Sequence, residues 1–135
     1  MNKTAIFIEH RECLQVKESI LESIIIDLIE NGIETFLSGG IGNFDWLSAN
    51  ILYHLKEKYP KINNILVIPY LNFNIRNKKI FDEIIYPEGF EKYHFKAAII
   101  KRNQYLAEHA SYAVCYVDHG WGGAAKLMNM LKSAD

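Results

Sequence analysis

Short apolar runs that alternate with helix-like segments constrain the fold of this chain more than any other feature. The runs predicted to be strands cover residues 4–8, 34–38, 65–69 and 112–117. Helical spacing of apolar residues predicts helices over 16–31, 44–58, 96–109 and 122–132. This alternation indicates βαβ units and a parallel sheet. We therefore expect one three-layer α/β domain over residues 1–135, with a mostly parallel sheet and helices on both faces.

Residues 70–95 form a long connection without clear periodicity. We expect a helical turn that runs into a short strand over 80–86, followed by a turn at 87–89. A connection of this length often closes over a ligand.

A glycine-rich turn stands between the second predicted strand and the second predicted helix. Gly39, Gly40 and Gly42 would let the backbone approach a bulky anion, and the helix after them would offer its N-terminal amides. Asp45 would either cap the first helical turn or accept hydrogen bonds from a ribose diol. The pair 122–123 repeats the glycine pattern before the last predicted helix, so two loops would face one another across a ligand cleft. Neither loop is a P-loop or a complete GxGxxG fingerprint.

The charge balance argues against nucleic acid as the principal partner. The net charge is -1 and the pI is near 6.5, and the basic residues are scattered along the chain. Binding of single-stranded nucleic acid in a local groove stays an open alternative. The apolar run at 23–29 contains Asp27 and is too short to span a bilayer, and the first residues lack a signal-peptide pattern. We expect a cytoplasmic protein with no membrane partner.

Cysteine and histidine spacing predicts no metal site and no resident cofactor. Cys13 and Cys115 form no CxxC motif, so each is interpreted as an ordinary reduced thiol, with a catalytic thiolate as the alternative. Four histidines share the lack of an HxxxH or HExxH pattern: His54, His94, His109 and His119.

Several charged or aromatic residues at predicted strand ends and on the third helix are candidates for ligand contact. Arg11 and Arg102 could hold phosphate or carboxylate oxygens with both arms of the guanidinium, or could be solvated or ion-paired surface residues. His10 could donate to a phosphate, act as an acid or base, or bond to neighbouring backbone. Asp118 could touch a ligand, and Trp121 could stack on a base or cover the edge of the core.

Six short motifs in order resemble one known superfamily. They are HRE at 10–12, SGGIGNFD at 38–45, LVIPY at 66–70, FDEIIYPEG at 81–89, KRNQYL at 101–106 and HGWGGAAK at 119–126. Together they resemble the SLOG superfamily, which joins the Smf/DprA proteins with the LOG nucleotide phosphoribohydrolases. The chain is most similar to the small single-domain branch near the YpsA-like proteins.

The resemblance implies a Rossmann-like sheet that binds nucleotides or nucleotide-derived molecules between the two glycine loops. With the residues at the predicted strand ends, the expected ligand-binding set is His10, Arg11, Ser38, Gly39, Gly40, Gly42, Asp45, Pro69, Arg102, Asn103, Asp118, Trp121, Gly122, Gly123 and Ala124.

The sequence departs from this superfamily at two places. Glu9 stands where the branch usually has glycine before His-Arg, which adds a carboxylate beside the expected anion site. The LOG enzymes carry PGGxGTxxE, whose glutamate assists cleavage of the N-glycosidic bond, whereas this chain has WGGAAKLMN and no acid there. A hydrolase would have to use Glu9, Asp45 or Asp118 instead. The chain also lacks an expected closing strand after its last helix, so a sheet edge would be open.

Three functional hypotheses follow. The first is a protein that binds a nucleotide or nucleotide-derived molecule to sense or sequester it, which the missing glutamate favours. The alternative is a nucleotide N-glycosidase or phosphoribohydrolase of LOG type. The third is an interaction module that uses a sheet edge or helix face. Homo-oligomerisation is expected in any case, while the base and the number of phosphates stay open.

Overall fold

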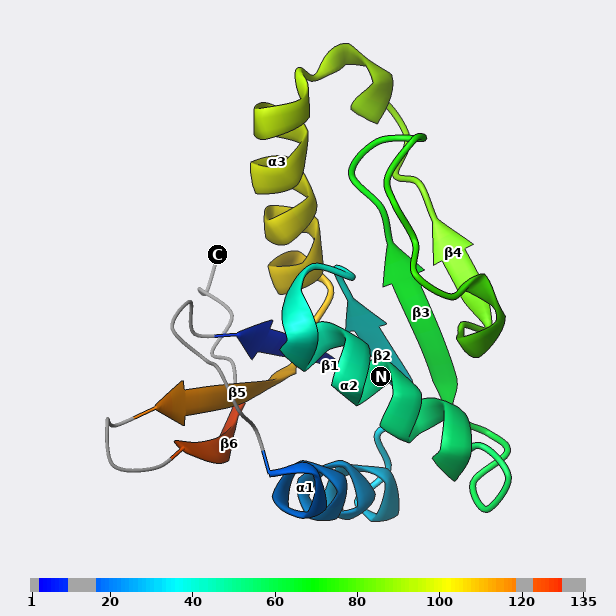
Figure 1. Ribbon diagram of the computed structural model, residues 1–135, viewed down its shortest axis with the longest axis vertical. Helices are drawn as coiled ribbons and strands as arrows, with labels where there is room; N and C mark the ends of the chain where they lie inside the picture. The colour runs from blue at the N-terminus through cyan, green and yellow to red at the C-terminus, as the bar shows by residue number, and fades with distance from the viewer. Residues whose placement is uncertain (1–2, 10–16, 119–122, 130–135) are drawn as a thin grey trace.

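The computed structural model describes residues 3–9, 17–118 and 123–129 (Figure 1). In chain order its elements are β1 (Thr4–Glu9), α1 (Glu18–Glu30), β2 (Thr35–Ser38), α2 (Gly42–Leu55), β3 (Asn63–Val67), the 3-10 turn η1 (Lys78–Ile80), β4 (Glu83–Ile85), the 3-10 turn η2 (Phe90–Lys92), α3 (Phe95–Glu108), β5 (Tyr112–Asp118) and β6 (Gly123–Asn129). No helix in the described ranges is long and apolar enough to cross a bilayer.

The strands form a single sheet in the order β4-β3-β2-β1-β5-β6. The pairs among β4, β3, β2, β1 and β5 are all parallel, and β6 runs antiparallel to β5. Successive strands β1 to β4 extend the sheet in one direction, and β5 then returns to the other side of β1. The carboxyl ends of the parallel strands therefore share one edge, with the change of direction between β1 and β5.

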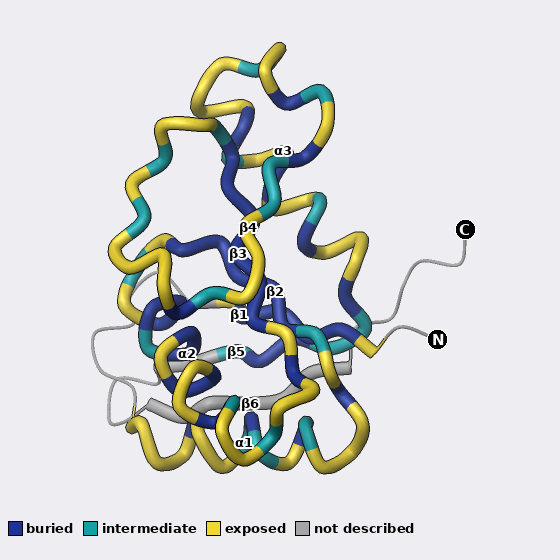
Figure 2. Tube along the Cα trace, turned by 90° about the vertical axis from the view of Figure 1, so that its right-hand side faces the viewer, coloured by how far each residue is buried: buried dark blue, intermediate teal, exposed yellow. Residues whose placement is uncertain are grey.

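Alternating side chains on the strands build one hydrophobic layer on each face of the sheet. Ala5 and Phe7 of β1 pack in a cluster with α1 and α2, whereas Ile6 between them packs in a cluster with α3. Figure 2 shows the central strands as buried and much of the outer surface of α1 as exposed. The three-layer α/β fold with a mostly parallel sheet and helices on both faces is thus confirmed.

The connection between β3 and α3 has the helical turn and short strand that the sequence predicts. It contains η1, and then β4 adds an edge strand beside β3. Asn64 of β3 holds this connection in place, because its buried side-chain amide donates to the carbonyls of Ala49 (3.1 Å) and Ile80 (2.9 Å). Further along, the ring of Tyr70 packs edge-on against Phe73 and Phe95.

The prediction of a C-terminal helix over 122–132 is wrong. Residues Gly123–Asn129 form β6, which pairs with β5 from Tyr112↔Asn129 to Asp118↔Gly123. The physical reason is that β5 would otherwise expose a row of unpaired backbone groups, and pairing with a strand only four residues away in sequence outweighs the high intrinsic helix propensity of AAKLM. The expectation that no strand closes this side of the sheet is wrong for the same reason.

Candidate ligand-binding site

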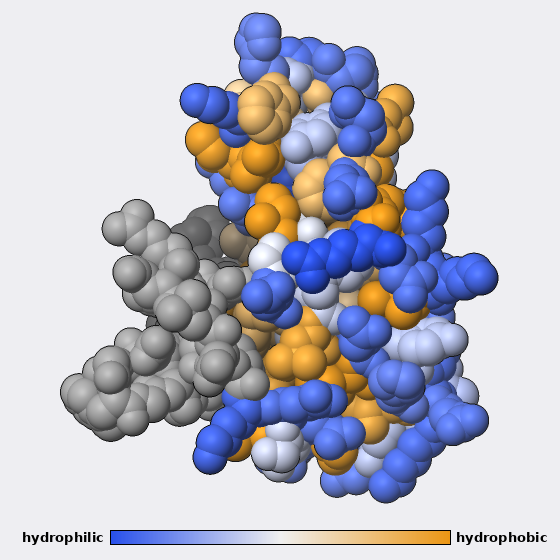
Figure 3. Space-filling model, in the orientation of Figure 1, coloured by the Kyte–Doolittle hydropathy of each residue, from blue (hydrophilic) through white to orange (hydrophobic). Residues whose placement is uncertain are grey.

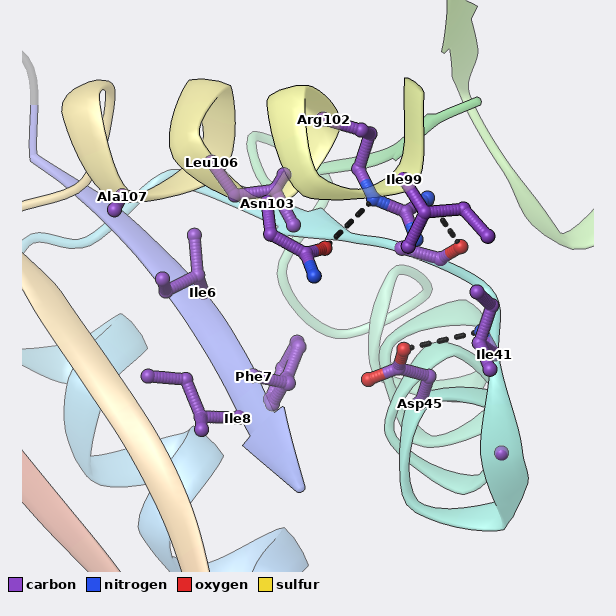
Figure 4. Close-up of a pocket in the computed structure, with 12 residues that line it drawn as sticks. Ile6, Phe7, Ile8, Ile41, Asp45, Ile99, Arg102, Asn103, Leu106 and Ala107 are labelled. Atoms are coloured by element: carbon purple, nitrogen blue, oxygen red, sulfur yellow. Dashed lines mark hydrogen bonds between the residues drawn. The ribbon is translucent and has the colours of Figure 1, made fainter. Parts of the chain in front are cut away.

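A cavity of about 520 Å³ opens where β1 and β2 end, between α3 and the N-terminus of α2. Its polar lining comes from Asp45 on α2, from Arg102 and Asn103 on α3, and from the glycine turn after β2. The remaining walls are apolar and consist of Ile6, Phe7, Ile8, Ile41, Ile99, Leu106 and Ala107. Figure 4 shows these side chains around the space between β1, α2 and α3. The volume lies within the range of about 300–1,000 Å³ that is usual for small-molecule sites.

The glycine turn brings the backbone of β2 close to Arg102 and to the core. Gly40 and Gly42 have φ values of 69° and 86°, which side-chain-bearing residues rarely adopt. A Cβ atom on Gly40 would lie 2.7 Å from Cδ1 of Leu66, and one on Gly39 would lie 2.9 Å from the guanidinium carbon of Arg102. Packing inside the protein therefore already requires glycine at positions 39 and 40.

Asp45 acts as a cap for α2 and also faces the cavity. The N-cap residue is Ile41, whose side chain has no acceptor, and the Asp45 carboxylate instead accepts from the Ile41 N–H at 3.2 Å. The residue is only 8% exposed and lines the cavity. Of the two roles expected for Asp45, the structure displays the capping role, and the carboxylate stands where a ligand in the cavity would meet it.

Arg102 is a buried cation that joins α3 to the ends of two strands. It is 2% exposed, which excludes a solvated surface residue. Its Nη1 donates to the carbonyl oxygens of Gly39 (2.7 Å) and Val67 (2.8 Å), at the ends of β2 and β3. Its Nε donates to Oδ1 of Asn103 at 3.0 Å. A guanidinium can hold a phosphate or carboxylate through its Nη1–Nη2 edge or through its Nε–Nη2 edge. Because Nη1 and Nε are both engaged, each edge has lost one of its donors, and Nη2 is the nitrogen whose donors remain available.

The charge of Arg102 is held in a partly apolar setting. Burial lowers the pKa of the guanidinium, while electrostatic interactions with Asp45 and, to a smaller extent, Tyr70 oppose this shift. The pKa of arginine starts so high that the side chain stays protonated at neutral pH. The guanidinium also stands over the ring of Phe73, 5.9 Å from its centroid. The cavity therefore contains a fixed positive charge on the α3 side and a carboxylate on the α2 side.

The other predicted site residues are placed less closely around this cavity. Ser38 and Pro69 are buried at the ends of β2 and β3 and do not line it. Asp118 ends β5, which runs beside β1 and finishes at the same edge of the sheet. His10, Arg11, Trp121 and Gly122 lie outside the described residues.

The expected second glycine loop is also corrected. Gly123 and Ala124 are the first residues of β6 and pair with Asp118 and Val117, so they do not precede a helix N-terminus. These residues therefore do not provide the helix N-terminus, and its positive dipole end, that the sequence predicts for the site. Among the described residues, the glycine turn that lines the cavity is the one after β2.

The sequence reasoning missed the apolar walls of the cavity. Ile8 and Ile41 are large apolar residues that are 43% and 46% exposed, and both line the cavity. Ile99 and Leu106 share one face of α3 with the predicted pair at 102–103, since they follow the i, i+3, i+4, i+7 spacing of a helix. That spacing was the signal that could have found them.

Metal ligation and thiol chemistry find no support in the described part of the chain. It holds no group of three or more His, Cys, Asp or Glu side chains arranged for a metal ion. Cys115 is half-buried against the cluster on the α3 side of the sheet, and burial raises the pKa of its thiol. This environment disfavours the thiolate and fits a packed thiol.

Comparison with known proteins decides the family. The sequence model of the YspA SLOG family matches residues 2–134. The chain belongs to this family. Membership confirms the SLOG resemblance and suggests a nucleotide-related function.

Two proteins of similar sequence come from bacilli. The chain is 25% identical over 134 residues to a UPF0398 protein of Bacillus pumilus (strain SAFR-032). The matched region covers 91% of this chain and 72% of that protein. It is also 25% identical over 139 residues to the uncharacterized SPbeta prophage-derived protein YoqJ of Bacillus subtilis (strain 168), with 88% and 81% covered.

Proposed function

We propose that this SLOG chain binds a nucleotide or nucleotide-derived small molecule, in order to sense or sequester it. The observation that carries the proposal is the cavity at the carboxyl edge of the sheet. The N-terminus of α2 stands on one side of it, and Arg102 and Asn103 stand on the other. Open α/β sheets place their ligands at this edge, close to the change of strand direction.

The chemistry of the lining supports the same proposal. The positive end of the α2 dipole and the Arg102 cation both favour an anionic group such as phosphate. Asp45 offers acceptor oxygens of the kind that hold a ribose diol. The walls formed by Ile41, Ile99 and Leu106 offer an apolar surface for a base.

The testing experiment is a thermal-shift screen with mass analysis of every hit. The panel contains mononucleotides, dinucleotide cofactors, ADP-ribose derivatives and cyclic nucleotides. A compound present at 100 times its Kd adds about 2.7 kcal/mol of stability, which raises the Tm by several degrees. We expect at least one such hit to be recovered chemically intact. A hit recovered as free base plus sugar phosphate would replace the binding proposal by the LOG-type hydrolase.

A matched pair of variants ties a hit to the cavity. Ile41→Glu places a carboxylate at the cavity wall, and Ile100→Glu makes the same change on α3 at a residue that does not line it. Both isoleucines are well exposed, at 46% and 59%, so both variants should fold. We expect the first to reduce the ligand-induced shift and the second to keep it. An unchanged Tm with every compound would overturn the proposal and favour an interaction module.

Self-association stays a prediction, and exposed apolar side chains support it. Leu71, Phe95 and Ile100 are among the most exposed large apolar residues. Figure 3 shows apolar surface interrupting the hydrophilic side chains over the upper half of the molecule. Contact with a second copy would remove such surface from water. Sedimentation at two protein concentrations measures whether the chain forms an oligomer.

A further inference from the structure

The contact between Arg102 and Asn103 determines which way the Asn103 amide faces. A guanidinium has five N–H donors and no acceptor, so the amide atom that Nε contacts at 3.0 Å must be the oxygen. The Asn103 NH₂ group therefore points away from Arg102. Figure 4 shows this nitrogen directed into the space below α3, where Asn103 lines the cavity.

The position of Arg102 is itself fixed by the fold. Nη1 bridges the carbonyls of Gly39 and Val67, and the residue is only 2% exposed. The guanidinium cannot turn to offer Asn103 another atom without giving up two hydrogen bonds to buried carbonyls. Asn103 is exposed and would otherwise be free to flip its amide.

We propose that Arg102 is a positioning residue that makes Asn103 a fixed hydrogen-bond donor to the ligand. The inference rests on the proposed function for its ligand. The Asn103 Nδ2 donates to no described residue, and Nη2 of Arg102 has no hydrogen bond within the same part of the chain. Two groups that only donate thus stand side by side on the α3 wall.

This arrangement determines the class of ligand atom that fits against α3. The atom must accept hydrogen bonds, so it is an oxygen of a phosphate, carboxylate, carbonyl or hydroxyl group, or an unprotonated ring nitrogen. An amino or ammonium group at this place would meet only donors and would leave the N–H groups of Arg102 and Asn103 unpaired. In a nucleotide the acceptor comes either from the phosphate or from the base and ribose.

Asn103→Asp tests the ligand part of the inference with AMP and adenosine as probes. The aspartate has the size of asparagine and still accepts from Arg102, but it presents an oxygen to the ligand in place of the NH₂ group. Gln104→Glu is the matched control, because it makes the same amide-to-carboxylate change at an exposed residue of α3 that does not line the cavity. We expect Asn103→Asp to weaken AMP binding by about tenfold or more and the control to keep it within about twofold.

The two probes separate the sources of the acceptor. A loss of affinity for AMP alone assigns the acceptor to the phosphate, and an equal loss for adenosine assigns it to the base or ribose. Wild-type affinity of Asn103→Asp for both probes would overturn the inference. If the wild type binds neither probe nor ADP-ribose, the ligand part falls together with the proposed function.

The positioning role has a readout that needs no ligand. In a proton–nitrogen correlation spectrum, the Arg102 Nε–H resonance reports the hydrogen bond to Asn103. We expect Asn103→Ala to move this resonance and Gln104→Ala to leave it in place. An Nε–H resonance that Asn103→Ala does not change would overturn the positioning role, whatever the protein binds.

Discussion

Replacing Arg102 by methionine removes a buried guanidinium that holds three parts of the fold together. The side chain reaches from α3 to the carbonyls of Gly39 and Val67, at 2.7 and 2.8 Å, and so fixes the ends of β2 and β3. Methionine keeps an unbranched side chain of similar length and fills much of the same space, but it donates no hydrogen bond. The variant therefore isolates the hydrogen bonds and the charge from the packing.

The expected cost follows from the two carbonyl oxygens that lose their donor. A hydrogen bond to a charged group contributes about 1.5–3 kcal/mol, and a buried acceptor left unpaired costs about 1–3 kcal/mol. Relief of the desolvation that lowers the pKa of Arg102 offsets part of this loss. We expect the free energy of unfolding to fall by about 3 kcal/mol and the Tm to fall by about 10 °C.

The assay is equilibrium unfolding in urea, with Lys96→Met as the control. Lys96 is an exposed cation on the same helix, so the control removes the same charge without touching a buried carbonyl. We expect the control to lie within about 0.5 kcal/mol of the wild type. A loss below about 1 kcal/mol for Arg102→Met, with an unchanged denaturant slope, would refute the reasoning that these bonds hold the strand ends.

Three further predictions concern the glycine turn, the helix cap and the thiol. Gly40→Ala should lower the free energy of unfolding by about 2 kcal/mol or more, because its Cβ would lie 2.7 Å from a leucine methyl group. Gly89→Ala should lose only the backbone cost of about 1 kcal/mol, since nothing lies within 4 Å of its Cβ. Equal losses of the two variants in urea would contradict this prediction. Asp45→Ala should cost about 1 kcal/mol in the same assay through loss of its bond to the N-cap amide, and an unfolding free energy equal to that of the wild type would count against the cap. Burial raises the pKa of Cys115, so the native state keeps its proton while the unfolded state loses it, and unfolding free energy should fall as pH rises above the usual range of a thiol. In Cys13→Ser protein the same thiol should alkylate more slowly than an unfolded peptide thiol, and an equal rate would contradict the prediction.

The sequence alone was sufficient for the parallel part of the fold. The apolar runs that became β1, β3 and β5 are short and bounded by polar residues, and amphipathic helices separate the strands, so local periodicity already indicates βαβ units. The glycine turn before α2 was predictable for the same local reason, because the turn needs glycine conformations at 40 and 42.

The tertiary structure decided what depends on a partner far away in the chain. AAKLM within β6 has a local preference for helix, and pairing with the open edge of β5 made it a strand. From the sequence, Arg102 is either a ligand-binding residue or a solvated or ion-paired surface residue. In the structure it is buried, because the carbonyls of Gly39 and Val67, 63 and 35 residues away, accept hydrogen bonds from its guanidinium. The edge of β5 and the two carbonyls can bond to β6 and to Arg102 only when the folded sheet brings them within hydrogen-bond distance. For that reason the helix over 122–132 was predicted wrongly, while the helices packed on the parallel sheet were predicted correctly.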